Sequence, residues 1–508
     1  MKKLLSITLC LMLALSMCGF AYGEEAAKWD TSKQDELIVS VMNNYYTQGW
    51  YDMAEAYMEL HPETTVTIDV IANNDALTQK FTTWMASDDL SDASDVTHIN
   101  FGNITSMQQK GQCFDFSTIL DEINPYTGVA VRDCFEEGDI KSYTNENGVY
   151  ALPFDHVGVA VMVNVSLLEE NGLEVPTTWE AWMADCAALK EAGYETPILA
   201  TAEATWTLAV LGDAAMRDQV GELIVQPGDG IYDEAVHGAN ADYVYDPEDL
   251  TCDVDVVMSS ERVAIYQSEH ELDDPIILSV WEVFAEMGSY MNANYEDSSS
   301  TEILTSFEMG ESAFLISGSW NVGVLNADML EMGDDAFEWE TIAFPDFETA
   351  PEGWASNKLR SLYGMGNTMG ILITGDEDHT ARVVDFMMFV HNPEGCAKMF
   401  ESTLNAGQFV QGPVAIKGVE LPAEITAKLE GFIAPASEKG DFSTIVGCGQ
   451  HLSEDQGSYR DYEIQMLTGE ITAAEFIENI KPLAAAKLAD TIEVNGYDLD
   501  PTTADTAK

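Results

Sequence analysis

A chain of 508 residues is too long for one hydrophobic core, so its length predicts two or more domains. Its 88 acidic and 22 basic residues give a net charge of −66, which argues against nucleic acid or an anionic membrane as a partner. The acidity is spread along the chain and predicts a solvated, self-repelling surface. Calcium capture is the alternative, but the acidic groups nearest to one another do not follow a calcium-loop spacing: Asp88, Asp89, Asp92, Asp95, Asp253 and Asp255.

Residues 1–23 have the pattern of an export signal, with two lysines before an apolar run that is too short to span a bilayer permanently. The small residues around Ala21 predict cleavage by a signal peptidase. Leu15–Cys18 instead resembles a lipobox, in which Cys18 would carry lipid. Met17 is large for a lipobox, so cleavage near Ala21 is favoured. Both routes predict a mature protein that works outside the cytoplasm, either secreted or attached to the cell envelope.

Six cysteines follow this signal, and none lies in a CxxC or Cys/His metal spacing. Export permits disulfides, but no pairing follows from the sequence. Cys186 falls on the apolar face of a predicted helix and is expected in the core.

The mature chain opens with strand, helix and strand patterns at residues 36–42, 51–59 and 66–71. Asn44 and Tyr45 lie just past the first strand, at the end where an open α/β sheet binds ligands. They are candidate ligand contacts, with the alternative that Tyr45 only covers the helix.

A third strand is predicted at residues 95–101. Phe101 and Asn103 lie at its end, on either side of a small residue that lets a ligand approach. They form a second pair of candidates.

The clearest α/β unit runs from Gly148 to Pro197. The apolar run at 157–163 predicts a strand buried on both faces of a parallel or mixed sheet. In the helix that follows, Thr177 is predicted to cap the first turn, Glu180 to complete a capping box, and Gly193 to end the helix.

Two later segments are distinctive. In Phe307–Trp320, a helix is expected to end at Gly310 and a strand to follow at 313–316. Tyr363–Ile371 is a glycine-rich turn into a strand. It does not fit a nucleotide loop, because no Lys-Ser/Thr follows and the strand comes after the glycines.

These motifs, in this order, resemble the extracellular solute-binding proteins of ABC importers, in the branch that captures mono- and oligosaccharides. The resemblance rests on Tyr150–Phe154, Asn164, Leu167-Leu168, Gly172-Leu173, Val175–Glu180, Thr196-Pro197 and Phe307–Trp320. The aromatic and lysine that the family places around Asn164 are Val163 and Val165 here, so the resemblance does not specify the sugar.

The resemblance implies an α/β fold with two lobes, of the type II periplasmic-binding-protein kind, and a ligand cleft between the lobes. The first lobe is expected at residues 24–152 plus 344–391, and the second at 153–343 plus 392–508. Hinge closure would trap a carbohydrate and present it to the importer's transmembrane permease, whose ATPase is another protein. The resemblance implies no catalytic residue, no metal and no cofactor. It implies that the protein is a monomer.

The resemblance also implies ligand contacts. Trp206 occupies the position where the family places an aromatic above the sugar, and Trp320 enters the cleft. Asp155 falls at a crossing between lobes, and Tyr363 and Asn367 belong to the glycine-rich turn that lines the cleft. For both tryptophans the alternative is a place in the core.

Two other classes of function stay open. A secreted glycoside hydrolase needs two carboxylates across a bond, and Asp155 and Asp346 can be drawn as such a pair. A binding protein for an anion or a metal chelate is the other. The proposed cleft segments carry no basic residue, which argues against an anion.

Overall fold

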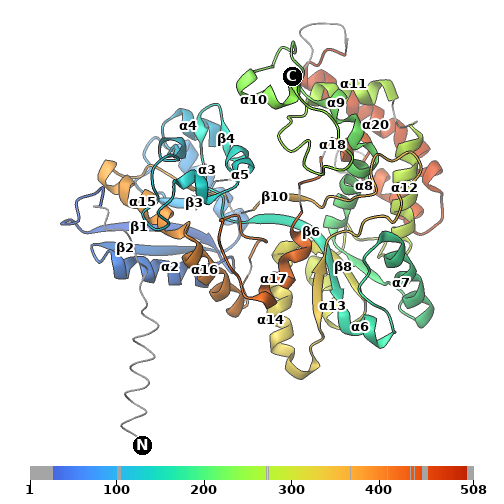
Figure 1. Cartoon of the computed structure of the whole chain (residues 1–508), viewed down its shortest axis with the longest axis horizontal. Helices are drawn as coiled ribbons and strands as arrows, with labels where there is room; N and C mark the ends of the chain where they lie inside the picture. The colour runs from blue at the N-terminus through green and yellow to red at the C-terminus, as the bar shows by residue number, and fades with distance from the viewer. Residues whose placement is uncertain are drawn as a thin grey trace, which may run out of the picture. The chain divides into compact units, whose positions relative to one another are not determined.

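The computed structural model describes residues 27–99, 104–270, 272, 274–366, 368–408, 410–434, 436–439, 441–448 and 456–499. Its contacts divide the chain into two compact units. The first comprises Met1–Phe154, Asn367–Thr403 and Val414–Glu420, so that segments coloured blue and orange in Figure 1 fold together. The second comprises Asp155–Gly366, Leu404–Pro413 and Leu421–Lys508.

The first unit is built on a four-stranded mixed sheet in the order β11-β3-β1-β2. The central strand β1 (Asp35–Met42) is parallel to β2 (Thr64–Ile71) and to β3 (Val96–His98), while β11 (Met369–Ile371) is antiparallel to β3. Helix α2 (Thr47–Leu60) connects β1 to β2, as the sequence predicts. The parallel pair therefore has the helical crossover that such strands require.

The other elements of the first unit follow the same α/β pattern. They are α3 (Asn74–Ala86), α4 (Ile104–Gln109), α5 (Glu137–Ser142), β4 (Thr144–Asn145), β5 (Gly148–Val149), α15 (Glu377–Val390) and most of α16 (Pro393–Asn405).

The second unit is organised around β6 (His156–Asn164), in which every residue except Val157 is buried. This strand pairs antiparallel with β8 (Phe314–Gly318), β9 (Trp339–Ile342) and β10 (Tyr363–Met365), and β7 (Ile198–Ala200) is parallel to β8. The prediction of a strand buried on both faces of a mixed sheet is confirmed.

Helices make up most of the second unit. They are α6 (Val165–Glu170), α7 (Trp179–Ala192), α8 (Trp206–Met216), α9 (Val220–Leu223), α10 (Glu234–Ala241), α11 (Ser260–His270), α12 (Pro275–Gly288), α13 (Ser300–Glu308), α14 (Val322–Met332), α17 (Ala423–Leu429), α18 (Asp441–Ile445), α19 (Gln456–Leu467) and α20 (Ala473–Asn495). Helices α6 to α9, α11, α12 and α18 to α20 contribute apolar side chains to one core, in which Trp281 of α12 packs on Phe476 of α20 with ring centroids 4.5 Å apart.

The start of α7 differs from the prediction. Its N-cap is Thr178, whose side chain accepts a hydrogen bond from Ala181 N, and not Thr177. Glu180 does not close a capping box, because its carboxylate accepts from Glu348 N at 2.9 Å. The predicted helix end is confirmed, since Gly193 has φ 109°.

The unit boundaries also differ from the expected lobes. Residues 344–366 belong to the second unit, because Phe344 and Phe347 are buried in its core and β10 pairs with β6. Residues 392–403 stay with the first unit, where Ser402 donates a hydrogen bond to Asp52 of α2 over 2.6 Å.

In the part of the chain that the structure describes, no helix has both the length and the apolar character needed to cross a membrane. No disulfide joins the six cysteines of this part, and Cys186 is buried in the core of the second unit, as predicted. The export signal lies outside the described residues.

Candidate functional site

Two tryptophans meet at the surface of the second unit. Trp206 is the first residue of α8, and Trp320 lies in the short 3-10 helix Ser319–Asn321 that follows β8. Their ring centroids are 6.4 Å apart with an angle of 81° between the planes. Both residues are half-buried, and Trp206 also packs against the core of the second unit. The pair offers aromatic surface that a flat, apolar face of a ligand can contact.

Gly318 sets the position of the Trp320 ring. A Cβ atom at Gly318 would lie 2.2 to 2.4 Å from three atoms of that ring. The backbone φ of Gly318 is −79°, which any residue adopts, so the requirement for glycine is steric. The glycine in the Gly-Ser-Trp sequence therefore lets the ring lie against the end of β8.

A carboxylate and an amide lie together at the start of β6. Asp155 is completely buried, and its carbonyl accepts a hydrogen bond from Gly366 N at 3.0 Å. A Cβ atom at Gly366 would lie 2.2 Å from Asp155 Oδ1 and 3.1 Å from Gln411 Oε1. Both polar side chains thus border the same glycine.

Tyr363 is held by His156. Its hydroxyl lies 2.8 Å from His156 Nδ1, and the two rings stack with centroids 4.3 Å apart. Tyr363 also pairs with Gly158 across β10 and β6. Its ring and hydroxyl therefore have a fixed place beside the start of β6.

Ser319 connects these groups to the tryptophans. Its hydroxyl accepts a hydrogen bond from Gly158 N at 3.2 Å and donates to the carbonyl of Gln411. A Cβ atom at Gly412 would lie 2.3 Å from the carbonyl oxygen of His156 and 2.8 Å from Ser319 Oγ. The segment Leu404–Pro413 is thus packed tightly against the ends of β6 and β8.

The second unit therefore holds four predicted contacts, namely Asp155, Trp206, Tyr363 and Trp320. The structure adds His156 and Gln411, which the sequence analysis missed. His156 could have been predicted, since it is the neighbour of the predicted contact Asp155. Gln411 could not have been predicted, because its segment contains no recognisable motif and lies at the site only through tertiary packing.

In the first unit, Asn44 and Tyr45 follow β1 as predicted. Asn44 is exposed with φ 68° in the turn, and Tyr45 is half-buried against Met42, Ile71 and Leu77. Burial raises the pKa of the Tyr45 hydroxyl. Phe101, Asn103 and Asn367 lie outside the described residues.

Asp346 does not have the freedom that a catalytic carboxylate needs. Its Oδ2 accepts a hydrogen bond from Lys358 Nζ at 2.7 Å, and its Oδ1 accepts from Leu359 N at 2.9 Å. Its carbonyl accepts from Trp179 N at 2.9 Å. These contacts stabilise the loop after β9 and argue against a hydrolytic pair with Asp155.

Two of the six aspartates considered for calcium are paired with basic side chains instead. Asp95 contacts His379, and Asp253 contacts Arg360. Within the described residues, no group of three or more His, Cys, Asp or Glu side chains has an arrangement that could hold a metal ion.

The model of the bacterial extracellular solute-binding protein family matches residues 43–395. The chain belongs to this family. That match spans the tryptophan pair, Asp155 and Tyr363, and places the work of the protein outside the cytoplasm. The family is one of binding proteins and not of enzymes.

The fold is also that of solved solute-binding proteins. The apo form of RafE from Streptococcus pneumoniae is similar with a TM-score of 0.56 and 18% identity, covering 90% of this chain and 98% of that one. A chitin oligosaccharide binding protein is similar with a TM-score of 0.54 and 16% identity, covering 90% of this chain and 99% of that one. Maltose-bound T. maritima MalE3 is similar with a TM-score of 0.54 and 13% identity, covering 89% of this chain and 99% of that one. A comparison with curated protein sequences found no match.

Proposed function

We propose that this solute-binding protein captures a mono- or oligosaccharide and delivers it to the transmembrane permease of an ABC importer. The half-buried pair Trp206 and Trp320 carries the proposal. A sugar ring presents a flat patch of C–H groups that packs on an aromatic face, and the aromatic pair supplies such a face. Solved structures of similar fold include RafE in complex with raffinose, at 17% identity and a TM-score of 0.53.

The polar neighbours of the pair suit sugar hydroxyls. Asp155 contributes a carboxylate, Gln411 an amide and Tyr363 a hydroxyl, and the hydrogen bond between Tyr363 and His156 orients this hydroxyl. A few fixed polar groups beside an apolar surface are typical of small-molecule sites. We assign the orientation of the sugar to these groups.

We further propose that the first unit closes over the sugar. Asn44, Tyr45, Phe101, Asn103 and Asn367 would contact it from that side. A ligand that touches both units only in the closed state favours closure, because its binding free energy differs between the two states. The closed monomer would then engage the permease, with the protein either released by cleavage near Ala21 or anchored through Cys18.

A thermal-shift screen over a glycan panel tests the proposal. A sugar present at 100 times its dissociation constant should add about 2.7 kcal/mol to the free energy of unfolding. Chromatography of the recovered oligosaccharide should find it intact. Stabilisation by non-sugar solutes alone would refute the sugar assignment, and hydrolysis products would show a glycoside hydrolase instead.

A further inference from the structure

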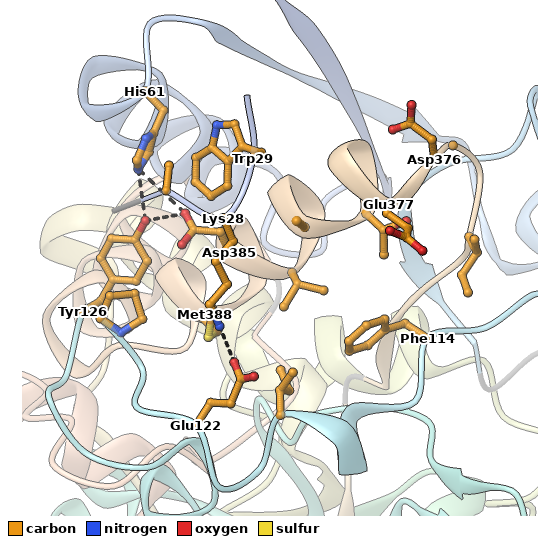
Figure 2. Close-up of a pocket in the computed structure, with 18 of the residues that line it drawn as sticks. Lys28, Trp29, His61, Phe114, Glu122, Tyr126, Asp376, Glu377, Asp385 and Met388 are labelled. Carbon is orange, nitrogen blue, oxygen red and sulfur yellow. Dashed lines mark hydrogen bonds and ion pairs between the residues drawn. The ribbon is translucent and has the colours of Figure 1, made fainter. Parts of the chain in front are cut away.

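The first unit contains a pocket with a volume of about 820 Å³. None of the six predicted sugar contacts that the structure describes lines it. It lies between helix α15, the segment 114–126 and residues 27–29 (Figure 2). Its volume falls within the range of about 300–1,000 Å³ that is common for sites of small ligands.

Most of the lining is apolar. The side chains that form it come from α15 and from the loops on either side, and they include Phe114, Ile119, Ile123, Ile373, Val384 and Met388. The carboxylates of the lining do not form a group that could hold a metal ion, since no such group occurs among the described residues. The apolar walls favour the apolar body of an organic molecule.

One carboxylate gives the pocket a polar end. Asp385 is 9% exposed, and its Oδ2 accepts hydrogen bonds from the hydroxyls of Tyr57 at 2.8 Å and Tyr126 at 2.6 Å. Both tyrosines donate to the same oxygen. No described residue donates a hydrogen bond to Oδ1, which leaves this atom able to accept one from a ligand.

The wall beside Asp385 is held in place by its own contacts. Trp29 is 7% exposed, its indole N–H donates to Glu63 at 3.1 Å, and its ring packs edge-on against His61 with centroids 5.4 Å apart. His61 Nε2 in turn lies 3.1 Å from the hydroxyl of Tyr126. Figure 2 shows Trp29, His61 and Tyr126 around Asp385.

The charge of the lining is negative. Glu122, Asp376, Glu377 and Asp385 line the pocket with Lys28, which forms an ion pair with Glu122. The other basic group of the lining is His61, whose Nε2 lies 3.7 Å from Asp385 Oδ2, so the carboxylates outnumber the basic groups four to two. An anion would be repelled, and a neutral apolar ligand would leave Asp385 Oδ1 without a donor.

We propose that this pocket binds an organic cation with an apolar body, such as an arylalkylammonium compound, whose ammonium group donates to Asp385. The ring of Tyr126 also suits a cation, because the face of an aromatic ring attracts positive charge. The Trp29 ring already has the Arg382 guanidinium 5.9 Å from its centroid. The site is separate from the proposed sugar site, so the two can be tested independently.

Three probes of the same shape test the proposal by calorimetric titration of the whole mature protein. The probes are 2-phenylethylamine, 2-phenylethanol and 3-phenylpropionate. The amine should bind at least about tenfold more tightly than the alcohol, which is the change expected for one hydrogen bond to a charged group. The carboxylate probe should not bind. Equal affinity for amine and alcohol, or no saturable binding of the amine at about 10 mM, would overturn the proposal.

Two variants locate the binding. Asp385→Asn keeps acceptors for the two tyrosines but removes the charge, and should abolish the preference for the amine. Ile123 is 53% exposed at the pocket lining, so Ile123→Arg adds a positive charge there with little effect on folding. Ile123→Arg should lower the affinity for the amine by about tenfold, while the matched control Ile123→Met should leave this affinity unchanged. Parental amine affinity in both Asp385→Asn and Ile123→Arg would contradict the assignment.

Discussion

Arg360 and Asp213 form an ion pair that is completely buried in the second unit. Arg360 Nε donates to Asp213 Oδ2 over 3.0 Å, and both side chains are 0% exposed. Arg360 Nη2 also donates to Asp253 Oδ2 at 3.0 Å, and Arg217 Nε donates to Asp213 Oδ2 at 3.1 Å. Burial alone would raise the pKa of Asp213, but the two arginines outweigh it and lower the pKa below its usual value. The cluster joins α8 to the loop after β9 and to the segment before α11.

Replacing Arg360 should be strongly destabilising. Arg360→Met leaves Asp253 without its cation in the protein interior, and breaking a buried ion pair in this way costs about 3–5 kcal/mol. Urea unfolding followed by tryptophan fluorescence measures the loss. The matched control is Lys358→Met, which breaks the half-exposed pair with Asp346 and should cost less than about 1 kcal/mol. Equal losses in the two variants would contradict this account of the cluster.

His379 links three elements of the first unit and should make its stability depend on pH. Its Nε2 lies 2.9 Å from Asp95 Oδ1, and its Nδ1 lies 2.8 Å from Asp35 Oδ2. The hydrogen bond to Asp95, opposed by burial and supported by Asp35, raises the pKa of His379 to about 9.

The sign of this dependence follows from the raised pKa. The folded state binds the proton more tightly than the unfolded state, so the contribution is complete below the unfolded pKa of about 6.5. It declines as the pH rises and is lost above about 9. His379→Gln should therefore lower the free energy of unfolding by about 1–3 kcal/mol at pH 6 and by much less at pH 10. A difference between parent and variant that stays constant from pH 6 to pH 10 would rule out this role for the imidazolium.

Much of the fold could be predicted because its signals are local. The apolar run of β6 and the glycine that ends α7 each specify structure through neighbouring residues. Thr472 and Glu475 form a capping box at the start of α20, which is likewise a contact between residues close in sequence. The predicted cap differs from the observed Thr178 by one residue, because two adjacent threonines offer equivalent side chains to the first turn.

The candidate site could be predicted only in part. Trp206 and Trp320 could be predicted as contacts because each lies in a segment with a recognisable pattern. Gln411 was not found, since its approach to Asp155 depends on how a distant segment packs on β6. The unit boundary was misplaced at Phe344 for the same reason. The sequence pattern around Phe344 indicates that the chain passes from one unit to the other. Only tertiary packing shows in which of the two cores the Phe344 side chain is buried.

Gly318→Ala tests the steric role of this glycine. The new methyl group must displace the Trp320 ring, because its carbon would lie within 2.4 Å of ring atoms. We expect sugar affinity to fall at least about tenfold with a loss of stability of only about 1–2 kcal/mol. Near-ultraviolet circular dichroism reports the environment of the Trp320 ring, and calorimetry measures the affinity for the sugar. Parental affinity together with an unchanged tryptophan spectrum would show that the ring does not need this space.

Closure on the sugar should be visible in solution. Moving the population from 1:99 to 99:1 in favour of the closed state requires about 5.5 kcal/mol of differential binding free energy, which stacked rings and several hydrogen bonds can supply. Small-angle X-ray scattering should give a smaller radius of gyration with saturating sugar than without it. An unchanged radius, with saturation verified by calorimetry, would contradict hinged capture.

Calorimetric titration of Trp320→Ala with the sugar found in the glycan screen tests the central claim most directly. Truncating a ring that stacks on the ligand should weaken binding by at least about 1–2 kcal/mol, or five- to thirtyfold. Tyr51→Ala serves as the matched control, because Tyr51 is 46% exposed on α2 of the first unit and is not a predicted contact. The account predicts weakened binding in Trp320→Ala and parental binding in Tyr51→Ala. Parental affinity in a folded Trp320→Ala protein would contradict it.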